Sequence, residues 1–507
     1  MSSTGPSPLF VPLNPSPRLV AQMTGLSLRQ SELEVSQQRN LKRMLRRIRA
    51  SRHHHAARHH HRKQGMSLLT LPAAATLSSP ADNEGGEWSD DTAADDDALA
   101  LLRRNDLHMD ISDNPAHDEL ARRVAELFNS VFEPLPPIDP AHVEVRRLSG
   151  AMTNCVFMVS VVPPPPALRH LNKPDLPSKY LLRVYGTGVD EFLSREKELY
   201  WLSQLTSLGF GPRLYGIFAN GRLEEFLEST TLTKDDIRNQ STSKHIARRM
   251  CELHSLVSYY RPFDLKHRGG LSAAGGVPEL WSNVDSWLRL VAKKWPRIRH
   301  ACRANPTCEA ILNDWSSLEH AVAKLRRVIL AANPPVVFAH DDLQYGNILR
   351  LEATGELVVV DFEYAGYNYR AFDIANHFCE WMADYHHPEH PHRLLEDRYP
   401  TAAQRCHFLR TYVKASAFLN ANMRAHKDVV ESDHDAHLEL RAIRLDDDRI
   451  RDEIAALDNE IVPFVPASHL HWGIWGLLQA CSSEIDFDYV AYAAQRLSIF
   501  LRMVDQL

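Results

Sequence analysis

The polar run AHDDLQYGNIL is followed a few residues later by LVVVDFEY, an apolar stretch that ends in a carboxylate. His340, Asp342 and Asn347 form the pattern H-x-D-x-x-x-x-N, and Asp361 stands fourteen residues after Asn347. Carboxylates gathered this closely repel one another unless a cation is shared between them. Amide and carboxylate oxygens suit Mg²⁺, so Asn347 and Asp361 are the candidate metal ligands. Asp342 is then placed to accept the proton of an attacking hydroxyl group, which is the chemistry of phosphoryl transfer.

The elements on either side must hold these groups in place. PPVVFAH and ELVVVDF are short β-rich runs bounded by Pro and Gly, so we expect the polar run to be a loop between an extended segment and a strand. We expect His340 to brace this loop rather than to react, because the neighbouring carboxylates already provide a base. We interpret Asp341 as structural.

The segment before this loop predicts a small α+β unit that begins with a helix near 113–132. Two β-rich runs are joined by a turn of small residues at Ser149–Asn154, which lets backbone N–H groups approach phosphate oxygens. A third run, YLLRVYG, places Arg183 among apolar neighbours, where a cation requires an anion. A helix then carries Glu196 and Glu198 near its start, and a hairpin ends the unit near Leu227.

Helical patterns prevail from Ser229 onward, and two groups of aromatic residues stand out among them: Trp381 with Tyr385, and Trp472 with Trp475. Trp472 and Trp475 are spaced i, i+3, so they share a helix face. Aromatic faces with nearby carboxylates suit a quaternary ammonium group, which has no N–H to donate. A packed core explains a Trp pair equally well, and the residues alone leave both interpretations open. The charged segment 427–460 is predicted to be an exposed helix or insertion with no chemistry of its own.

Composition divides the 507 residues into three parts. Residues 1–110 are poor in aromatic residues and are expected to be a mostly disordered extension. Residues 111–228 form the β-rich unit and 229–507 the helical unit. Within the extension, the basic segment 27–52 has partly helical spacing; it fits either a weak contact with an anionic membrane surface or partner, or a solvated regulatory tail. With a net charge of −6, we expect no nucleic-acid partner.

Seven scattered cysteines without a CxxC pair indicate a reducing, intracellular setting. No apolar run approaches the length of a membrane span, and the Pro-rich start lacks the features of a secretory leader. We therefore expect a soluble, cytoplasmic protein.

Several long motifs resemble one family. In chain order they are SGAMTN, LLRVYG, GPRLYGIFANGRLEEFL, HDDLQYGNIL, VVVDFEYAGYNYRAFDIANHFCEWMADY, HWGIWGLLQA and IDFDYVAYA. Over roughly residues 140–507 the sequence is similar to the choline/ethanolamine kinases, and to the fungal choline kinases in particular. It departs from protein kinases, because it has no G-x-G-x-x-G, no V-A-I-K lysine and no A-P-E, and D-F-E stands in place of D-F-G.

The resemblance implies a bilobal, protein-kinase-like α+β fold with a β-rich N-lobe, a helical C-lobe, and ATP with Mg²⁺ in the cleft. It implies that Arg183 replaces the protein-kinase lysine and that Gln344 belongs to the nucleotide site. Either Glu196 or Glu198 would pair with Arg183. The phosphate-facing turn would comprise Gly150, Ala151, Met152, Thr153, Asn154 and Cys155, and the adenine-contacting hinge Glu225, Phe226 and Leu227. Ala151 stands where many relatives have a second glycine, which bears on the flexibility of the turn.

The resemblance also implies an aromatic cage for choline, formed by Tyr385, Trp472, Trp475, Phe487 and Tyr492, with Glu380 and Asp486 as anionic partners and Asp342 facing the hydroxyl group. The run CEWMADY favours choline over ethanolamine. The implied reaction transfers the γ-phosphoryl group of ATP to choline, giving phosphocholine for phosphatidylcholine synthesis. Relatives are often dimers, so the resemblance is compatible with a homodimer.

Other readings stay open. The first is an ethanolamine kinase or an enzyme of dual specificity. The second is a protein kinase or antibiotic phosphotransferase on the same fold. The third is an inactive kinase-fold scaffold or a membrane-recruited binding module.

Overall fold

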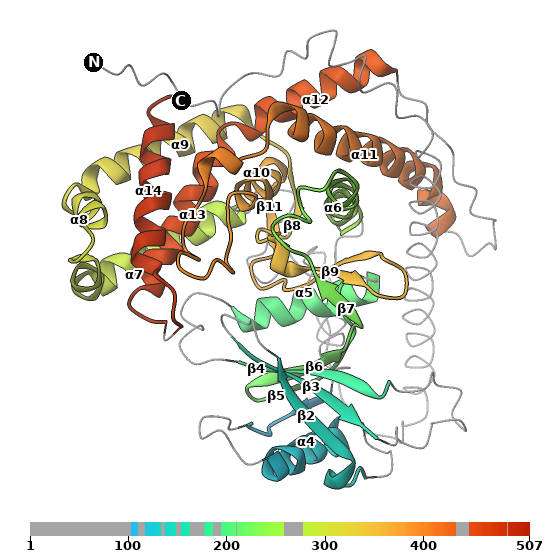
Figure 1. The fold of residues 1–507 in the computed structure, drawn as a ribbon. Coiled ribbons are helices and arrows are strands. Elements are labelled where there is room, and N and C mark those ends of the chain that lie inside the picture. Colours follow the sequence, from blue (N-terminus) through green and yellow to red (C-terminus); the bar gives the residue numbers. More distant parts are fainter. Residues whose placement is uncertain are drawn as a thin grey trace, which may run out of the picture.

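The computed structural model describes residues 103–109, 117–132, 137–148, 154–162, 177–185, 194–208, 210–257, 277–431, 446–483 and 485–507. These residues form a β-rich lobe and a larger helical lobe, with α5 and β7 between the sheet and the helices (Figure 1). The expected bilobal α+β fold is confirmed. The basic segment 27–52 and the phosphate-facing turn at 150–153 lie outside the described residues.

The N-lobe is built on a six-stranded sheet with the order β1-β5-β6-β4-β3-β2. Its strands are β1 (Arg103–Asn105), β2 (Val143–Leu148), β3 (Asn154–Val161), β4 (Lys179–Tyr185), β5 (Leu214–Phe218) and β6 (Gly221–Glu225). Strand β1 is parallel to β5, and the other neighbours are antiparallel. Because β1 falls within residues 1–110, the ordered sheet takes a strand from the range expected to be an extension.

Helix α4 (His117–Val131) covers this sheet because its apolar residues share one face. Val124, Leu127 and Phe128 are fully buried, and the Phe128 ring lies edge-on to Tyr180 of β4 with centroids 4.7 Å apart. The β5–β6 turn requires glycine at Gly221, because a Cβ atom there would lie 2.3 Å from the Arg183 carbonyl oxygen. That close approach aligns β6 with β4, so Arg183 and Arg222 face each other across the strands.

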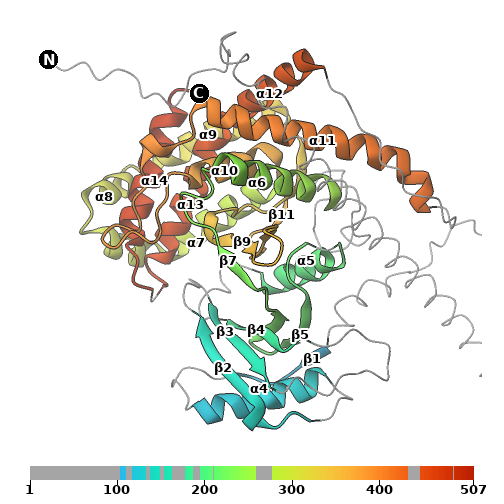
Figure 2. The same ribbon diagram turned by 45° about the vertical axis from the view of Figure 1, so that its right-hand side comes forward.

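The C-lobe is mainly helical (Figure 2). After α5 (Arg195–Leu208) in the N-lobe come α6 (Gln240–Glu252), which continues as a π-helical turn at Leu253–Val257, α7 (Glu279–Cys302), α8 (Pro306–Asn313), α9 (Trp315–Ala332), α10 (Arg370–Glu380), α11 (Ala402–Glu431), α12 (Asp447–Ile461), α13 (Phe464–Gln479) and α14 (Tyr489–Val504). Two small sheets lie beneath the helices. One joins β7 (Ser229–Thr231), β9 (Ile348–Leu351) and β10 (Leu357–Val359), and the other joins β8 (Val336–Ala339) and β11 (Gly366–Tyr369).

Helix α12 differs from the expectation for the segment 427–460. Ile450, Ile454, Leu457 and Ile461 are buried at helical spacing, against α10, α11 and α13. Asp458 is also buried and forms an ion pair with Arg405 at 2.8 Å. The prediction of a solvated face is therefore wrong for α12, because its many charges concealed an apolar stripe. Residues 432–445 lie outside the described part of the chain.

Candidate active site

The loop that follows β8 is held by a buried carboxylate on α10. The backbone N–H groups of His340 and Asp341 donate to the two oxygens of Asp373, each at 3.0 Å. His254 Nε2 donates to the same carboxylate at 2.9 Å. Burial opposes the charge on Asp373, yet the hydrogen bond from His254 lowers its pKa. Sequence reasoning did not single out Asp373, which fixes the start of the loop.

His340 braces the loop from inside, as expected. Its ring is fully buried, and burial lowers its pKa, so the imidazole is neutral. Nε2 donates to the Val360 carbonyl at 3.0 Å, and Nδ1 accepts from the Asp342 backbone N–H at 3.3 Å. With both nitrogens engaged, His340 ties the loop to the chain just before Asp361.

Asp342 lies where several negative charges meet. Asn347 Nδ2 donates to its Oδ2 at 2.8 Å and to its backbone carbonyl at 2.9 Å. Burial, together with the negative charges of Glu380, Asp361 and Glu363, raises the pKa of Asp342 well above its usual range. A cation bound nearby offsets those charges and favours the carboxylate form that a general base requires.

The carboxylate groups of three residues lie close together beside the loop that carries Asp342. Oxygens of Glu198, Asp361 and Glu363 are all within 4.8 Å of one another. Among the described residues, Asp361 Oδ1 and Glu363 Oε2 are buried without a hydrogen-bond partner. Burial and the charges of Asp361 and Glu198 raise the pKa of Glu363 to about 8. An all-oxygen donor set in which Asp361 Oδ1 has no hydrogen-bond partner, and in which Glu363 Oε2 lies 3.5 Å from Arg195 Nη1 without a hydrogen bond, fits a hard divalent cation such as Mg²⁺.

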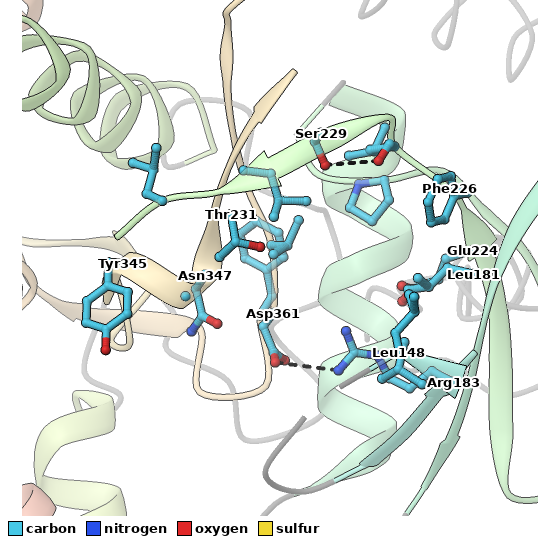
Figure 3. Close-up of a pocket in the computed structure, with 18 of the residues that line it drawn as sticks. Leu148, Leu181, Arg183, Glu224, Phe226, Ser229, Thr231, Tyr345, Asn347 and Asp361 are labelled. Carbon is cyan, nitrogen blue, oxygen red and sulfur yellow. Dashed lines mark hydrogen bonds and ion pairs between the residues drawn. The ribbon is translucent and has the colours of Figure 1, made fainter. Parts of the chain in front are cut away.

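Of the two predicted metal ligands, Asp361 belongs to this group. Asn347 lies beside it on the same wall of the cleft, and its side-chain oxygen is not used in the contact with Asp342 (Figure 3). Sequence reasoning missed Glu363, although D-F-E was visible in the sequence. Asp361 has a φ of 67° and Asp341 a φ of 65°, both in the left-handed region that is costly for residues other than glycine. Such strain is often retained at functional sites.

A cavity of about 950 Å³ opens between the lobes beside these residues. Leu148, Val156 and Leu181 line it from the sheet, and Asn347 and Asp361 line it from the C-lobe (Figure 3). The predicted nucleotide residues Arg183, Glu225, Phe226 and Leu227 all line this cavity. Its mixture of apolar walls and charged groups suits the purine ring of a nucleotide at one end and its phosphates at the other.

The remaining predicted nucleotide residues have different positions. Gln344 Oε1 accepts from the Gly346 N–H at 2.8 Å and caps the turn Tyr345–Asn347, so its amide is engaged within the loop. Asn154 begins β3, and the half-buried Cys155 Sγ lies 3.5 Å from Arg147 Nη2. Gly150, Ala151, Met152 and Thr153 lie outside the described residues.

An ion-pair network joins Arg183 to the carboxylate-rich end of the cleft. Its Nη1 lies 3.5 Å from Asp361 Oδ2 (Figure 3). Glu196 is exposed, whereas Glu198 is 2 % exposed and lies 2.6 Å from Arg222 Nη1. Burial opposes the charge on Glu198, but Arg222, Arg195 and Arg183 lower its pKa. Of the two glutamates, Glu198 is therefore the one that acts on Arg183 electrostatically, after Asp361 and Glu224, while its own ion pairs are with Arg222 and Arg195. Arg222 is a buried cation that sequence reasoning missed.

The C-terminal helices gather an aromatic cluster, here defined as Tyr364, Trp472, Trp475, Phe487 and Tyr492. The two Trp rings of α13 lie 5.5 Å apart, and Tyr364 lies 5.2 Å from Trp472. Tyr492 of α14 lies 6.3 Å from Trp475 and 5.6 Å from Phe487, measured between ring centroids. The structure therefore brings four of the predicted cage residues together.

The other residues predicted for the acceptor site differ in burial and in their contacts. Tyr385 Oη donates to Glu380 Oε2 at 2.7 Å, and Glu380 raises the pKa of Asp342, which places both beside the catalytic loop. Asp486 is exposed, so it does not act as a buried anionic partner. Sequence reasoning missed Tyr364, which follows the D-F-E motif directly. Burial and the charges of Glu363 and Asp342 raise the pKa of Tyr364, so this ring connects the carboxylates with the cluster.

Comparisons with known proteins agree with this geometry. A family model described as choline/ethanolamine kinase matches residues 145–501. The choline kinase of Schizosaccharomyces pombe is 32% identical over 374 residues, which cover 70% of this chain and 74% of that protein. The probable choline kinase 2 of Arabidopsis thaliana is 34% identical over 364 residues, 71% of this chain and 85% of that protein. A solved ethanolamine kinase of Plasmodium vivax superposes with a TM-score of 0.55 at 22% identity, covering 82% of this chain and 95% of that one.

Fold and site thus define a kinase of the two-lobed phosphotransferase class. Within that class, the chain belongs to the choline/ethanolamine kinase family. The expected family is confirmed. A search of the described helices found none with both the length and the apolar character needed to cross a membrane.

Proposed function

We propose that this enzyme transfers the γ-phosphoryl group of ATP to the hydroxyl group of choline, producing phosphocholine and ADP. The observation that carries the proposal is the setting of Asp342. Asn347, which donates to Asp342, lines the cavity together with Asp361. On the other side, Asn376 links the neighbouring Asp341 carbonyl to Trp472 of the aromatic cluster. A base between a phosphate site and an ammonium site would have the two substrates of this reaction on either side of it.

On the nucleotide side, the adenine ring would lie against Phe226 and Leu227, and Arg183 would face the phosphates. Asp361, Glu363 and Asn347 would hold Mg²⁺, with Glu198 completing the oxygen-rich wall. When bound, the ion neutralises charge on the phosphate oxygens. Asp342, oriented by Asn347, would take the proton of the choline hydroxyl group.

On the acceptor side, the trimethylammonium group would lie against the aromatic cluster and Tyr385. Each cation–π contact contributes roughly 0.5–2 kcal/mol, with the larger values where the ring and cation are desolvated. Trp472 is fixed for this role, because its Nε1 donates to Asn376 Oδ1 at 2.8 Å. We place the reaction in the cytoplasm, in keeping with seven free cysteines and a product that serves phosphatidylcholine synthesis.

Substitution of one cluster residue tests the acceptor assignment. Trp475→Ala should raise KM for choline about tenfold or more while changing KM for ATP less than about threefold. Trp315→Ala is the matched control, because Trp315 packs edge-on against Trp295, with centroids 5.1 Å apart, at the start of α9. Equal increases in both KM values for Trp475→Ala would refute the assignment.

A further inference from the structure

Arg496 of α14 is a buried cation beside the proposed choline site. Its side chain is fully buried, and Nη2 lies 2.9 Å from Glu380 Oε1. The guanidinium also lies over the Tyr492 ring, 5.0 Å from the centroid. Glu380 itself is only 2 % exposed. Neither charge of this pair therefore reaches bulk solvent, and each is compensated by the other.

The second oxygen of Glu380 is engaged as well. Tyr385 Oη donates to Oε2 at 2.7 Å. Burial and the Glu380 charge raise the pKa of Tyr385, so the phenol keeps its proton and remains a donor. One carboxylate thus has a cation on one oxygen and a hydroxyl group on the other, before any substrate is present.

This arrangement offers different interactions to a primary and to a quaternary ammonium group. A primary ammonium group has three N–H donors, each of which needs an acceptor when it leaves water. A trimethylammonium group has no such donor and binds well to aromatic faces alone. Because Arg496 and Tyr385 already occupy Glu380, the carboxylate offers little to a primary ammonium group, and the aromatic faces remain for the quaternary one.

We propose that Arg496 is a positioning residue that acts through Glu380, together with Tyr385, to make the acceptor site selective for a quaternary over a primary ammonium alcohol. The inference rests on the proposed function and deepens it. Arg496 does not contact the substrate. It removes the free carboxylate charge that would otherwise attract both ligands.

The sharpest test is a change in the specificity ratio, defined as kcat/KM for choline divided by kcat/KM for ethanolamine. Tyr385→Phe keeps the aromatic ring and frees Glu380 Oε2, so the ratio should fall about tenfold, the factor that one hydrogen bond contributes. The ratio should fall because kcat/KM for ethanolamine rises. Tyr489→Phe is the matched control, because Tyr489 packs on Phe487 while its hydroxyl group contacts Ser483 at 3.2 Å. It should keep the ratio within about twofold of the wild type.

Arg496 is tested by a pair of variants. Arg496→Met should lower the ratio, and Arg496→Lys, which retains the cation, should keep it closer to the wild-type value. If Arg496→Met does not fold, as judged by loss of a cooperative thermal transition, Tyr385→Phe decides the question. A parallel loss of kcat/KM for both alcohols, with the ratio unchanged in Tyr385→Phe, would overturn the inference.

The wild-type enzyme separates this inference from the proposed function. Absence of choline-dependent ADP release by the wild type would refute the function itself. Wild-type choline turnover with an unaltered ratio in the variants would refute only the role of Arg496 and Tyr385.

Discussion

Asp342 is the residue that we propose as the general base of this enzyme. Asn347 holds one of its oxygens, and the nearby charges of Glu380, Asp361 and Glu363 raise its pKa together with burial. The same charges would hold a proton on Asp342 in the absence of a cation. The proposed metal site and the proposed base are therefore coupled through electrostatics.

Replacement of Asp342 by Asn tests this residue. The change keeps the shape of the side chain but removes its ability to take a proton, so kcat should fall by roughly 10² to 10⁴-fold. KM for ATP should change little. Steady-state kinetics with saturating choline measures the effect, and Asp285→Asn, which removes a carboxylate paired with Arg326 on the surface of α7, provides the control. A loss smaller than about tenfold would exclude the general-base role.

At the residue scale, the sequence predicted those site residues that lie close to one another along the chain. Asp342, Asn347 and Asp361 lie within one short segment, and the spacing of Trp472 and Trp475 placed them on one helix face. Asp373 and Arg496 were missed because their partners come from elements distant in sequence. Glu363 and Arg222 were missed because Glu198, which lies close to both, comes from α5. Glu380 and Arg496 are separated by 116 positions, so no local pattern could pair them.

Helix α10 is the element that joins the catalytic loop to the aromatic cluster. Asp373, Asn376, His377 and Glu380 occupy one face at i, i+3, i+4 and i+7. Asn376 Nδ2 donates to the Asp341 carbonyl at 3.0 Å, while its Oδ1 accepts from Trp472 of α13 at 2.8 Å. Because Asn376 makes both contacts, α10 sets the distance between the loop that carries Asp342 and the aromatic cluster.

His377 gives α10 a measurable pH signature. Its Nδ1 donates to the Leu343 carbonyl at 2.8 Å, and its Nε2 accepts from Trp381 Nε1 at 3.3 Å, so the ring is neutral. Burial lowers its pKa to about 4. Because the folded pKa lies below the unfolded value, the unfolded state binds more protons as pH falls. This contribution, about 3 kcal/mol, is present above pH 6.5 and is lost as pH falls toward 4.

Thermal unfolding between pH 7 and pH 4 measures this contribution. His377→Gln, which keeps a donor and an acceptor but does not titrate in this range, should reduce the pH dependence of stability. Other buried histidines, including His471 with a pKa of about 3, contribute the same sign, so the slope should decrease rather than vanish. An unchanged slope in His377→Gln would contradict the neutral, buried state of this ring.

At the element scale, hydrophobic periodicity predicted most of the long helices and the central strands of the N-lobe, but not α10 or the short strands β1, β7, β9 and β11. Prediction from periodicity failed where one sequence pattern was compatible with two different structures. The sequence 308–332 has one continuous helical pattern, but the structure breaks it at Asp314, which has φ −114° and ψ 50° and separates α8 from α9. In α12, charged residues on the exposed side masked an apolar stripe that only its packing partners reveal.

At the scale of the whole molecule, three ion pairs between described residues cross from one lobe to the other. Arg183 lies 3.5 Å from Asp361, Arg195 lies 3.5 Å from Glu363, and Lys197 lies 2.7 Å from Glu279 of α7. Two of these pairs end on the proposed metal ligands. Metal binding should therefore stabilise the arrangement of the lobes as well as the chemistry, because it compensates the carboxylates that meet at their junction.

Magnesium should raise the Tm of the nucleotide-free enzyme, since a ligand at about 100 times its Kd stabilises by about 2.7 kcal/mol. Glu363→Gln should abolish most of this shift, because it removes one proposed ligand. Glu279→Gln is the control: it removes the ion pair with Lys197, so Tm should be lower, but the magnesium-induced shift should persist. A full shift in Glu363→Gln would show that the ion does not bind at this carboxylate group.

The measurement that tests the central claim most directly is ADP release by the purified full-length enzyme with ATP and Mg²⁺. Choline, ethanolamine, an aminoglycoside, a peptide mixture and no acceptor should be compared at equal concentrations. We predict strong choline-dependent turnover, weaker turnover with ethanolamine, and background rates with the others. Turnover of an aminoglycoside or peptide without choline turnover, or no turnover with any acceptor, would contradict the assignment of this enzyme as a choline kinase.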